Sequence, residues 1–225
     1  SGASSSDTTK GAFDIRGYRD SASGGAGGTY CAQSTAANNG CNAWTTSDNF
    51  VNTNKSGSVL LEAGLNTFLN TTYKDRLSQK ALINTGTTWN VGPSSSYNDT
   101  NTVSQLRELE ARYQWTGDIA LITKSEYINA NSNTDCQTAK ILNDVKNTDT
   151  CRVTNYLYKS DYWFWLLSPR PSYVYDVLLA HTDGSINNSN ASYTSGRVRP
   201  ALYLKSSVNL TGKGTSAHPY SIVTG

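Results

Sequence analysis

The stretch YWFWLLSP at residues 162–169 is dense in aromatic and aliphatic side chains. Aromatic residues favour strands, and proline cannot donate to a β-ladder. The run therefore predicts a buried strand over Tyr162–Leu167 that ends at Ser168-Pro169. Trp163 and Trp165 are two residues apart and share one strand face. We interpret that face as core rather than as a platform for a ligand.

More strands are predicted on the C-terminal side of this run. The segments Tyr173–His181, Arg197–Leu204 and Tyr220–Val223 carry β-forming residues between turn signals. Thr182–Ser185 has the composition of a tight turn, and Asn187–Ser195 that of a polar loop.

Helical patterns occupy the earlier part of the chain. Apolar residues recur at intervals of three and four over Ser58–Ala81 and Val103–Trp115, and a shorter helical piece is expected at Thr138–Val145. Gly117–Thr123 resembles a buried strand, and Thr123 and Glu126 have the spacing of a capping box that opens a short helix. Helices that precede short antiparallel strands indicate an α+β fold.

Length and composition limit the class of protein. The 225 residues fit a single domain over 13–225, with the low-complexity residues 1–12 as a linker or cloning remnant. Hydrophobic residues (36%) and aromatics (10%) supply enough apolar area for a core, which argues against a disordered chain. No apolar run is long enough for a transmembrane helix, and a formal charge of +2 gives no reason to expect nucleic acid.

The four cysteines form two pairs that are local in sequence. Cys31 and Cys41 bracket one polar stretch, and Cys136 and Cys151 bracket another. Neither pair has zinc-ligand spacing, so we predict two local disulfides and an extracellular location. Four reduced cysteines in a cytosolic protein are the alternative, and thiol titration of the denatured, unreduced protein distinguishes the two.

Motifs for catalysis and for cofactors are absent. The sequence contains no H-E-x-x-H, G-x-S-x-G or P-loop motif. His181 and His218 are the only histidines, and we interpret both as exposed polar residues rather than as general bases. Glu108 and Glu110 are interpreted as solvated surface charges. We therefore expect no enzyme activity, no cofactor and no metal.

The segment between the two strongest strands has the composition of a recognition surface. Residues 168–195 combine tyrosines with asparagine, serine and glycine, as antibody recognition loops do. An ordinary surface loop is the alternative interpretation.

Two motifs resemble a known family. Trp165-Leu-Leu-Ser-Pro169, then Asp183-Gly184 and Gly196-Arg-Val-Arg-Pro-Ala-Leu-Tyr-Leu204, resemble the W-L-x-S-P … D-G … G-V-R-P-x-L-x-L signature of bacterial surface domains. These domains have a C-type-lectin-like fold and are related to formylglycine-generating enzymes. The similarity covers residues 42–223, and Arg197 is an insertion relative to the signature.

The resemblance implies a C-type-lectin-like fold and a role in recognition, as in pilin-like and phage-tail surface proteins. In some relatives a diversity-generating retroelement varies the segment before the G-V-R-P strand. Carried onto this chain, the ligand-binding face comprises Arg170, Ser172, Tyr173, Tyr175, Asp176, His181, Asn187, Asn188, Asn190, Ser192 and Tyr193. The calcium motifs of animal lectins and the copper-binding cysteines of formylglycine-generating enzymes are absent, so neither metal is implied.

Arg199 and Pro200 are expected to be structural. Pro200 lacks an N–H and belongs at a strand edge or bulge. Arg199 is expected to brace the variable loop through carboxylate or carbonyl contacts.

Three functional hypotheses follow. The first is a non-enzymatic, adhesin-like module on a bacterial cell surface or pilus that binds a protein or glycan ligand. The second is a structural pilin-like subunit that self-assembles through an apolar helix preceding Ser1. The third, a glycan hydrolase, depends only on scattered carboxylates.

Overall fold

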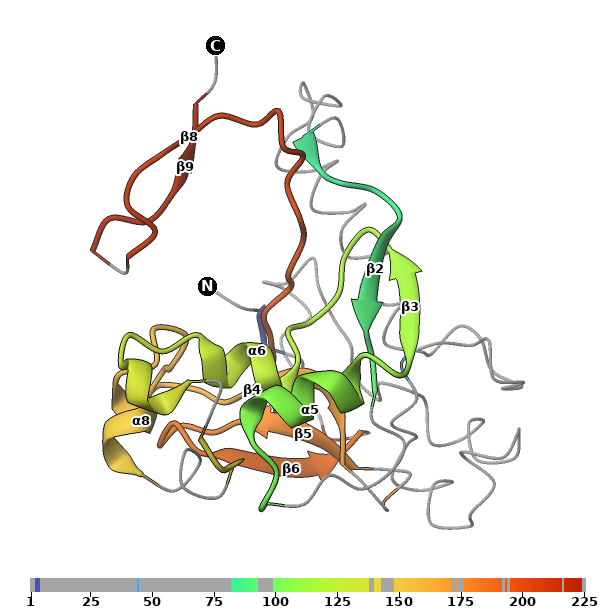
Figure 1. The fold of residues 1–225 in the computed structure, drawn as a ribbon, viewed down its shortest axis with the longest axis vertical. Helices are drawn as coiled ribbons and strands as arrows, with labels where there is room; N and C mark the ends of the chain where they lie inside the picture. Colours follow the sequence, from blue (N-terminus) through green and yellow to red (C-terminus); the bar gives the residue numbers. More distant parts are fainter. Residues whose placement is uncertain are drawn as a thin grey trace.

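The computed structural model describes residues 3–4, 44, 82–92, 99–137, 140–142, 148–170, 173, 176–191, 193, 195–215 and 217–223. Helices and strands are mixed (Figure 1). In chain order they are β1 (Ala3–Ser4), β2 (Thr87–Asn90), α5 (Val103–Glu110), β3 (Gln114–Gly117), α6 (Lys124–Asn129), the 3-10 helix η2 (Thr134–Cys136), α8 (Asp149–Val153), β4 (Phe164–Pro169), β5 (Asp176–Ala180), β6 (Ile186–Asn190), β7 (Arg197–Val198), β8 (Leu210–Thr211) and β9 (Ser221–Ile222). The predicted helix Ser58–Ala81 and the Cys31–Cys41 pair lie outside the described residues, as does most of Thr138–Val145.

A five-stranded sheet with the order β1-β7-β4-β5-β6 organises the fold. β5 runs antiparallel to both of its neighbours, β4 and β6. β7 pairs with β4 through Phe164 and Arg197, so the aromatic segment and the Arg-Pro segment are neighbours in one sheet. This pair is parallel, so the expectation of purely antiparallel strands is wrong here. β1 lies within the 1–12 stretch and pairs with β7.

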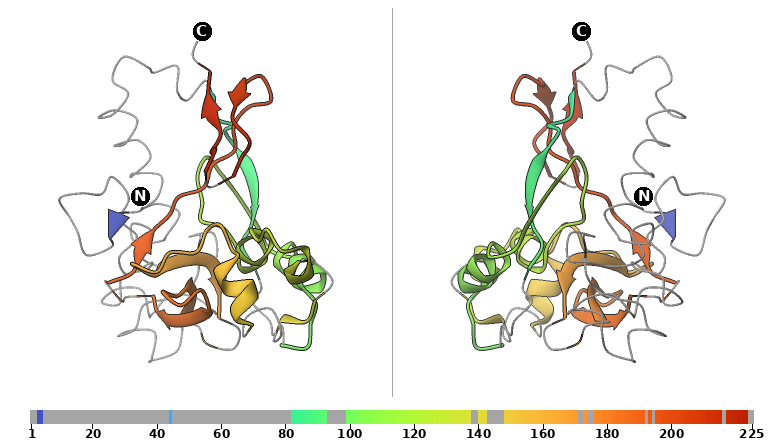
Figure 2. Two further views of the ribbon diagram at one scale, coloured as in Figure 1. Left: turned by 90° about the vertical axis from the view of Figure 1, so that its left-hand side faces the viewer. Right: turned by 90° about the vertical axis from the view of Figure 1, so that its right-hand side faces the viewer.

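The central strands are buried on both faces. Trp165, Leu167, Val177 and Leu179 pack on one face against Trp89 and the segment 119–121. Phe164, Leu166, Leu178 and Ala180 pack on the other face against Tyr127 of α6. Figure 2 shows the helices α5 and α6 beside this sheet in both views. Strands covered on both faces become continuous apolar runs, which is why YWFWLLSP carries no polar alternation.

Two predicted strands have different bounds in the structure. The strand expected at Gly117–Thr123 is wrong: the strand there is β3, paired with β2, and Ile119–Leu121 are buried without forming a strand. The strand expected at Arg197–Leu204 ends at Val198, shortly before Pro200. In the remainder of the predicted strand, from Pro200 to Leu204, single bridges at Ala201 and Leu204 replace a ladder, because proline removes a ladder donor.

The polar loop expected at Asn187–Ser195 is also wrong in its first part, because β6 occupies Ile186–Asn190 and pairs with β5. Asparagine is disfavoured in strands. Here the Asn188 side chain donates a hydrogen bond to Asp176, a diagonal neighbour on β5 (3.0 Å), and Ile186 packs against the apolar core. These tertiary contacts outweigh local propensity. The expected turn at Thr182–Ser185 is confirmed, with Gly184 at φ +82°.

Helices α5 and α6 begin where the sequence predicts. α5 starts at Val103 with a capping box formed by Thr102 and Gln105. α6 starts at Lys124 with the expected capping box of Thr123 and Glu126. α5 ends at Glu110 rather than at Trp115, because residues 114–117 pair with β2.

Gly196 is required by close aromatic packing. A Cβ atom there would lie 2.1 Å from Cζ3 of Trp163 and 2.7 Å from Nε1 of Trp165. Overpacking of this kind costs about 1–3 kcal/mol. We expect Gly196→Ala to lower the free energy of urea-induced unfolding by that amount, and the exposed neighbour Ser195→Ala to change it by less than about 0.5 kcal/mol. Equal effects of the two substitutions would contradict this packing.

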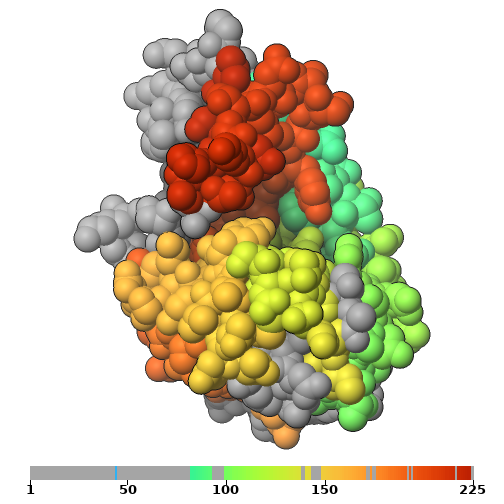
Figure 3. Space-filling view, turned by 60° about the vertical axis from the view of Figure 1, so that its left-hand side comes forward, coloured from blue at the N-terminus to red at the C-terminus, as the bar shows by residue number. Residues whose placement is uncertain are grey.

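The C-terminal strands β8 and β9 form a separate two-stranded hairpin, and the strand expected at Tyr220–Val223 is confirmed as β9. In Figures 1 and 2 the hairpin stands at the end of the molecule away from β5 and β6. The space-filling view in Figure 3 shows this C-terminal part, coloured red, projecting beyond the yellow and orange body.

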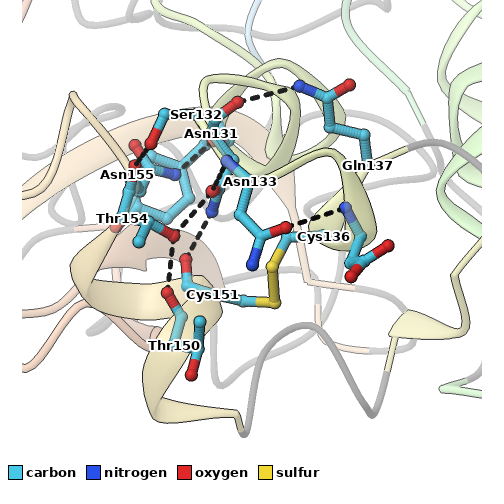
Figure 4. The surroundings of a disulfide bond; sticks show 11 residues. Asn131, Ser132, Asn133, Cys136, Gln137, Thr150, Cys151, Thr154 and Asn155 are labelled. Atoms are coloured by element: carbon cyan, nitrogen blue, oxygen red, sulfur yellow. Dashed lines mark hydrogen bonds between the residues drawn. A yellow bond between two sulfur atoms is a disulfide. The ribbon is translucent and has the colours of Figure 1, made fainter.

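The predicted disulfide Cys136–Cys151 is confirmed. It joins η2 to α8 and lies beside a network centred on Asn131 (Figure 4). The Asn131 side-chain amide donates to the Cys151 carbonyl (2.5 Å), and its oxygen accepts from the Thr154 hydroxyl (2.7 Å). A disulfide closing a loop of this size contributes about 3 kcal/mol to the free energy of unfolding.

Among the described residues, no helix is long and apolar enough to cross a membrane.

Candidate functional site

Asp176 lies at the centre of the best-connected part of the predicted ligand-binding face. It is the first residue of β5 and only 4% of its surface is exposed. Its Oδ2 atom accepts from Arg170 Nη1 at 2.8 Å, and the Arg170 backbone N–H donates to the Asp176 carbonyl at 2.9 Å. The buried carboxylate therefore closes the connection between β4 and β5.

The same carboxylate oxygen also holds a residue of the edge strand. Asn188 lies opposite Leu178 in the β5–β6 ladder, and its Nδ2 donates to Asp176 Oδ2 at 3.0 Å. Hydrogen bonds to an ionised carboxylate are stronger than neutral ones. Asp176 thereby fixes one side chain from the end of β4 and one from β6.

Tyr173 extends this group toward solvent. The Arg170 guanidinium lies 3.9 Å from the centre of the Tyr173 ring, within the range of a cation–π contact. The tyrosine remains 41% exposed. We call Arg170, Tyr173, Asp176 and Asn188 the Asp176 cluster: a buried anchor, two polar side chains held by it and an exposed aromatic ring.

The strand register separates the remaining asparagines. Asn190 lies opposite Asp176, and residues opposite each other share a face. Asn190 is therefore on the same sheet face as the Asp176 cluster. Asn187 lies opposite Leu179, on the other face. The sequence analysis assigned all of these asparagines to one ligand-binding surface, whereas the structure places them on two faces of the sheet.

Tyr193 belongs to a second aromatic group. Its ring stacks on Trp163 at 5.9 Å, and Trp163 meets Trp165 edge to face at 5.0 Å. Trp165 is buried as predicted, whereas Trp163 is only partly buried. Trp163 precedes β4 and Arg170 follows it, so these two residues lie at opposite ends of that strand.

His181 lies at the end of β5 opposite to Asp176. Its Nδ1 is 3.4 Å from Asp183 Oδ1, in the turn before β6. Hydrogen bonds from Ser185, the strongest from its hydroxyl, lower the pKa of Asp183. This position supports a structural role for His181 in the turn and separates it from the Asp176 cluster. Ser172, Tyr175 and Ser192 lie outside the described residues.

Arg199 has a carbonyl partner, but in a different segment from the one expected. Its Nη1 donates to the carbonyl of Leu157, and its guanidinium lies 4.8 Å from the centre of the Phe164 ring. Arg199 thus braces the segment before β4 rather than the loop after it. The Arg197 guanidinium lies over the ring of Tyr162, at 4.2 Å from its centre.

The sequence analysis missed a buried polar network. Glu110 was expected on the surface, but it is buried at the end of α5. Its carboxylate accepts from the hydroxyl and backbone N–H of Ser125 and from Ser168 Oγ, and Ser168 Oγ in turn accepts from the Lys124 backbone N–H at 2.8 Å. The network ties α5 and α6 to β4. In the sequence, the feature that could have indicated this network is Ser168, a polar residue at the end of an apolar strand.

The Glu110 network predicts a pH dependence of stability. Burial raises the pKa of Glu110 above its usual value of 4.5. A carboxyl group whose pKa is raised by folding makes its full contribution to the free energy of unfolding below the unfolded-state pKa. It loses this contribution as the pH rises through the folded-state pKa. In urea unfolding at a series of pH values above about 4.5, we expect Glu110→Gln to lose less stability with rising pH than the wild type. Parallel curves would contradict this, and the exposed Glu108→Gln serves as control.

The described residues do not suggest a metal or substrate pocket. No three histidine, cysteine or carboxylate side chains among them are grouped as metal ligands. A cavity beside the disulfide, lined by Tyr127, Asn131, Arg152 and Asn155 among others, has a volume of about 10 Å³. This volume fits one water molecule.

Comparisons with known proteins give one match. Residues 46–206, more than half of the chain, match a family described as a domain of unknown function, DUF6273. No curated protein and no solved structure matches the chain. The matched region includes β2 to β7 and the whole Asp176 cluster. The chain therefore belongs to the DUF6273 family.

Proposed function

We propose that this protein is a non-enzymatic recognition module with a C-type-lectin-like fold, displayed on a bacterial cell surface or pilus. It binds a protein or glycan ligand through the Asp176 cluster. The observation that carries the proposal is that one buried carboxylate oxygen holds both Arg170 and Asn188 while Tyr173 stays exposed.

Preorganisation is the physical reason why this arrangement favours binding. Each rotamer-rich side chain that becomes ordered on association costs about 0.5–1.5 kcal/mol. Arg170 is held at both its backbone and its guanidinium, and Tyr173 lies against that guanidinium. Much of the entropic cost of ordering these side chains therefore arises during folding and not on binding. Tyr173 offers contact area with few free torsions.

Two other features agree with a surface location and with the proposed fold. The disulfide Cys136–Cys151 is a bond that persists in oxidising compartments. The two motifs that resemble the lectin-like signature lie side by side as β4 and β7.

A binding panel tests the proposal. We would screen the full chain against immobilised glycans and surface proteins, and measure each binder with Tyr173→Ala/Asn188→Ala. The matched control is Arg112→Ala/Tyr156→Ala, which removes two exposed side chains elsewhere. We expect the first variant to weaken binding at least about tenfold and the control to bind like the wild type.

The opposite pattern, or a panel without any binder, would overturn the proposal. The triple variant of Tyr173, Tyr175 and Tyr193 to alanine extends the test to the second aromatic group. We expect it to abolish binding while the melting temperature changes little. Retention of binding would show that the ligand contacts a different face.

A further inference from the structure

Arg152 lies where α8 meets the turn between β5 and β6. Its Nη2 atom donates to Asp149 on the same helix, and its Nη1 atom lies 3.8 Å from Asp183 Oδ2 in the turn. A Cβ atom at Gly184 would lie 2.8 Å from Cβ of Arg152, so the turn packs directly on this side chain. Arg152 therefore connects the helix that carries one cysteine of the disulfide to the β5–β6 hairpin.

One donor of this guanidinium has no protein acceptor. The Nε atom of Arg152 is buried, and among the described residues no atom accepts its hydrogen bond. A buried donor without an acceptor has lost its hydration and gains no bond in exchange. In native proteins, buried polar groups are satisfied by other protein groups or by ordered water. The Nε–H group therefore needs an acceptor that the described side chains and backbone do not supply.

A cavity adjoins this donor. Its lining comes from α6, α8, the turn and β6, with Tyr127, Arg152 and Gly184 among the residues, and its volume is about 10 Å³. A buried water molecule needs about this volume and about two to four polar partners. The size of the cavity and the missing acceptor of Nε, which are independent observations, therefore indicate the same small ligand.

Two further polar atoms on the cavity wall complete the hydrogen bonding of a water molecule. The Tyr127 hydroxyl donates to the Gly184 carbonyl at 3.1 Å. A carbonyl oxygen has two lone pairs, and a hydroxyl that donates one hydrogen bond can still accept another. Both oxygens can therefore accept from a water molecule whose own oxygen accepts from Arg152 Nε.

We infer that a structural water molecule binds in this cavity, where it accepts from Arg152 Nε and donates to the Tyr127 hydroxyl and the Gly184 carbonyl. It joins α6, α8 and the β5–β6 turn beside Cys151, which also lines the cavity. The turn follows β5, whereas Asp176 is the first residue of that strand. This water site is therefore independent of the proposed recognition function.

The first test detects the water in the full wild-type chain. In ¹⁵N-labelled protein, the Nε–H resonance of Arg152, assigned by its loss in Arg152→Lys, should show a nuclear Overhauser effect to a long-lived water molecule. The exposed Arg112 is the control and should show only fast exchange with solvent. A high-resolution crystal structure should show a water oxygen within hydrogen-bonding distance of Arg152 Nε. A protein acceptor on Nε, or exchange as fast as that of Arg112, would overturn the inference.

A double-mutant cycle tests whether the water connects the two side chains. The hydrogen bonds printed in this structure for Arg152 and Tyr127 go to different partners, so no direct bond joins them. Arg152→Lys keeps the charge but removes Nε, and Tyr127→Phe removes the hydroxyl. Each substitution should raise the unfolding equilibrium constant about tenfold. Because either one releases the water, their combined effect should be at least about twofold smaller than the product of the single effects.

The control cycle combines Arg152→Lys with Tyr156→Phe, which alters a tyrosine that is largely exposed. In this cycle the two effects should multiply, because Tyr156 does not line the cavity. Multiplicative effects of Arg152→Lys and Tyr127→Phe would contradict a shared water molecule.

Discussion

Replacing Trp165 by alanine is expected to lower the free energy of unfolding by about 3–5 kcal/mol. Trp165 is among the largest fully buried side chains and packs in the core between the sheet and the segment 119–121. Its ring also meets Trp163, and its Nε1 lies close to Gly196. Because a small domain is stable by only about 5–15 kcal/mol, this single substitution removes a large fraction of the total.

Urea unfolding followed by circular dichroism measures the effect. Tyr156→Ala is the matched control, since this aromatic residue is largely exposed and its removal should cost less than about 0.5 kcal/mol. A cost below about 1 kcal/mol for Trp165→Ala would show that β4 is not the centre of the core.

Asp176→Ala is expected to abolish ligand binding and to cost about 2–4 kcal/mol of stability. The substitution removes the acceptor shared by Arg170 and Asn188. The Arg170 side chain is 36% exposed, so solvent compensates part of its lost ion pair, and the stability cost lies below that of a fully buried pair. Both side chains become free to move, and Tyr173 loses the fixed guanidinium beneath it.

Two companion variants separate anchoring from direct ligand contact. Asp176→Asn keeps the shape and an acceptor oxygen but loses the charge, and it should bind with intermediate affinity. Asn187→Ala lies on the opposite face of the sheet and removes an exposed acceptor of the Asn188 backbone N–H, and it should bind like the wild type. Wild-type binding by Asp176→Ala would show that the cluster is structural and has no part in recognition.

Sequence patterns were most informative where local physics decides the structure. The capping box at Thr123 and Glu126, the start of α5 at Val103 and the turn at Gly184 depend on residues close in sequence. The Cys136–Cys151 pairing is also local. The aromatic run was recognised because a strand buried on both faces needs a continuous apolar sequence.

The errors in the fold came from tertiary contacts. β6 consists largely of asparagine and serine, and its pairing with β5 is stabilised by Asp176 and Asn188, residues whose proximity no local pattern reveals. Glu110 looked like a surface charge because its acceptor role requires Ser125 and Ser168, which lie on other elements. The early end of α5 follows from pairing of the next segment with β2.

The sequence predicted which segment carries the candidate site from its composition, but not how its residues are arranged. Tyrosine and asparagine marked the segment between β4 and β7, but alternation along β6 places Asn187 and Asn188 on opposite faces. Asp176 was assigned to ligand contact, whereas its burial makes it an anchor. Tyr193 stacks on Trp163 because the chain returns toward the start of β4 to form β7, a path that composition does not encode.

Hydroxyl-radical footprinting of the complex tests the recognition account most directly. The full chain would be labelled alone and with a binder from the panel, and modification of each exposed tyrosine quantified. The account predicts that Tyr173 loses its reactivity in the complex while Tyr156 keeps its own. Unchanged reactivity of Tyr173, with protection elsewhere on the chain, would contradict it.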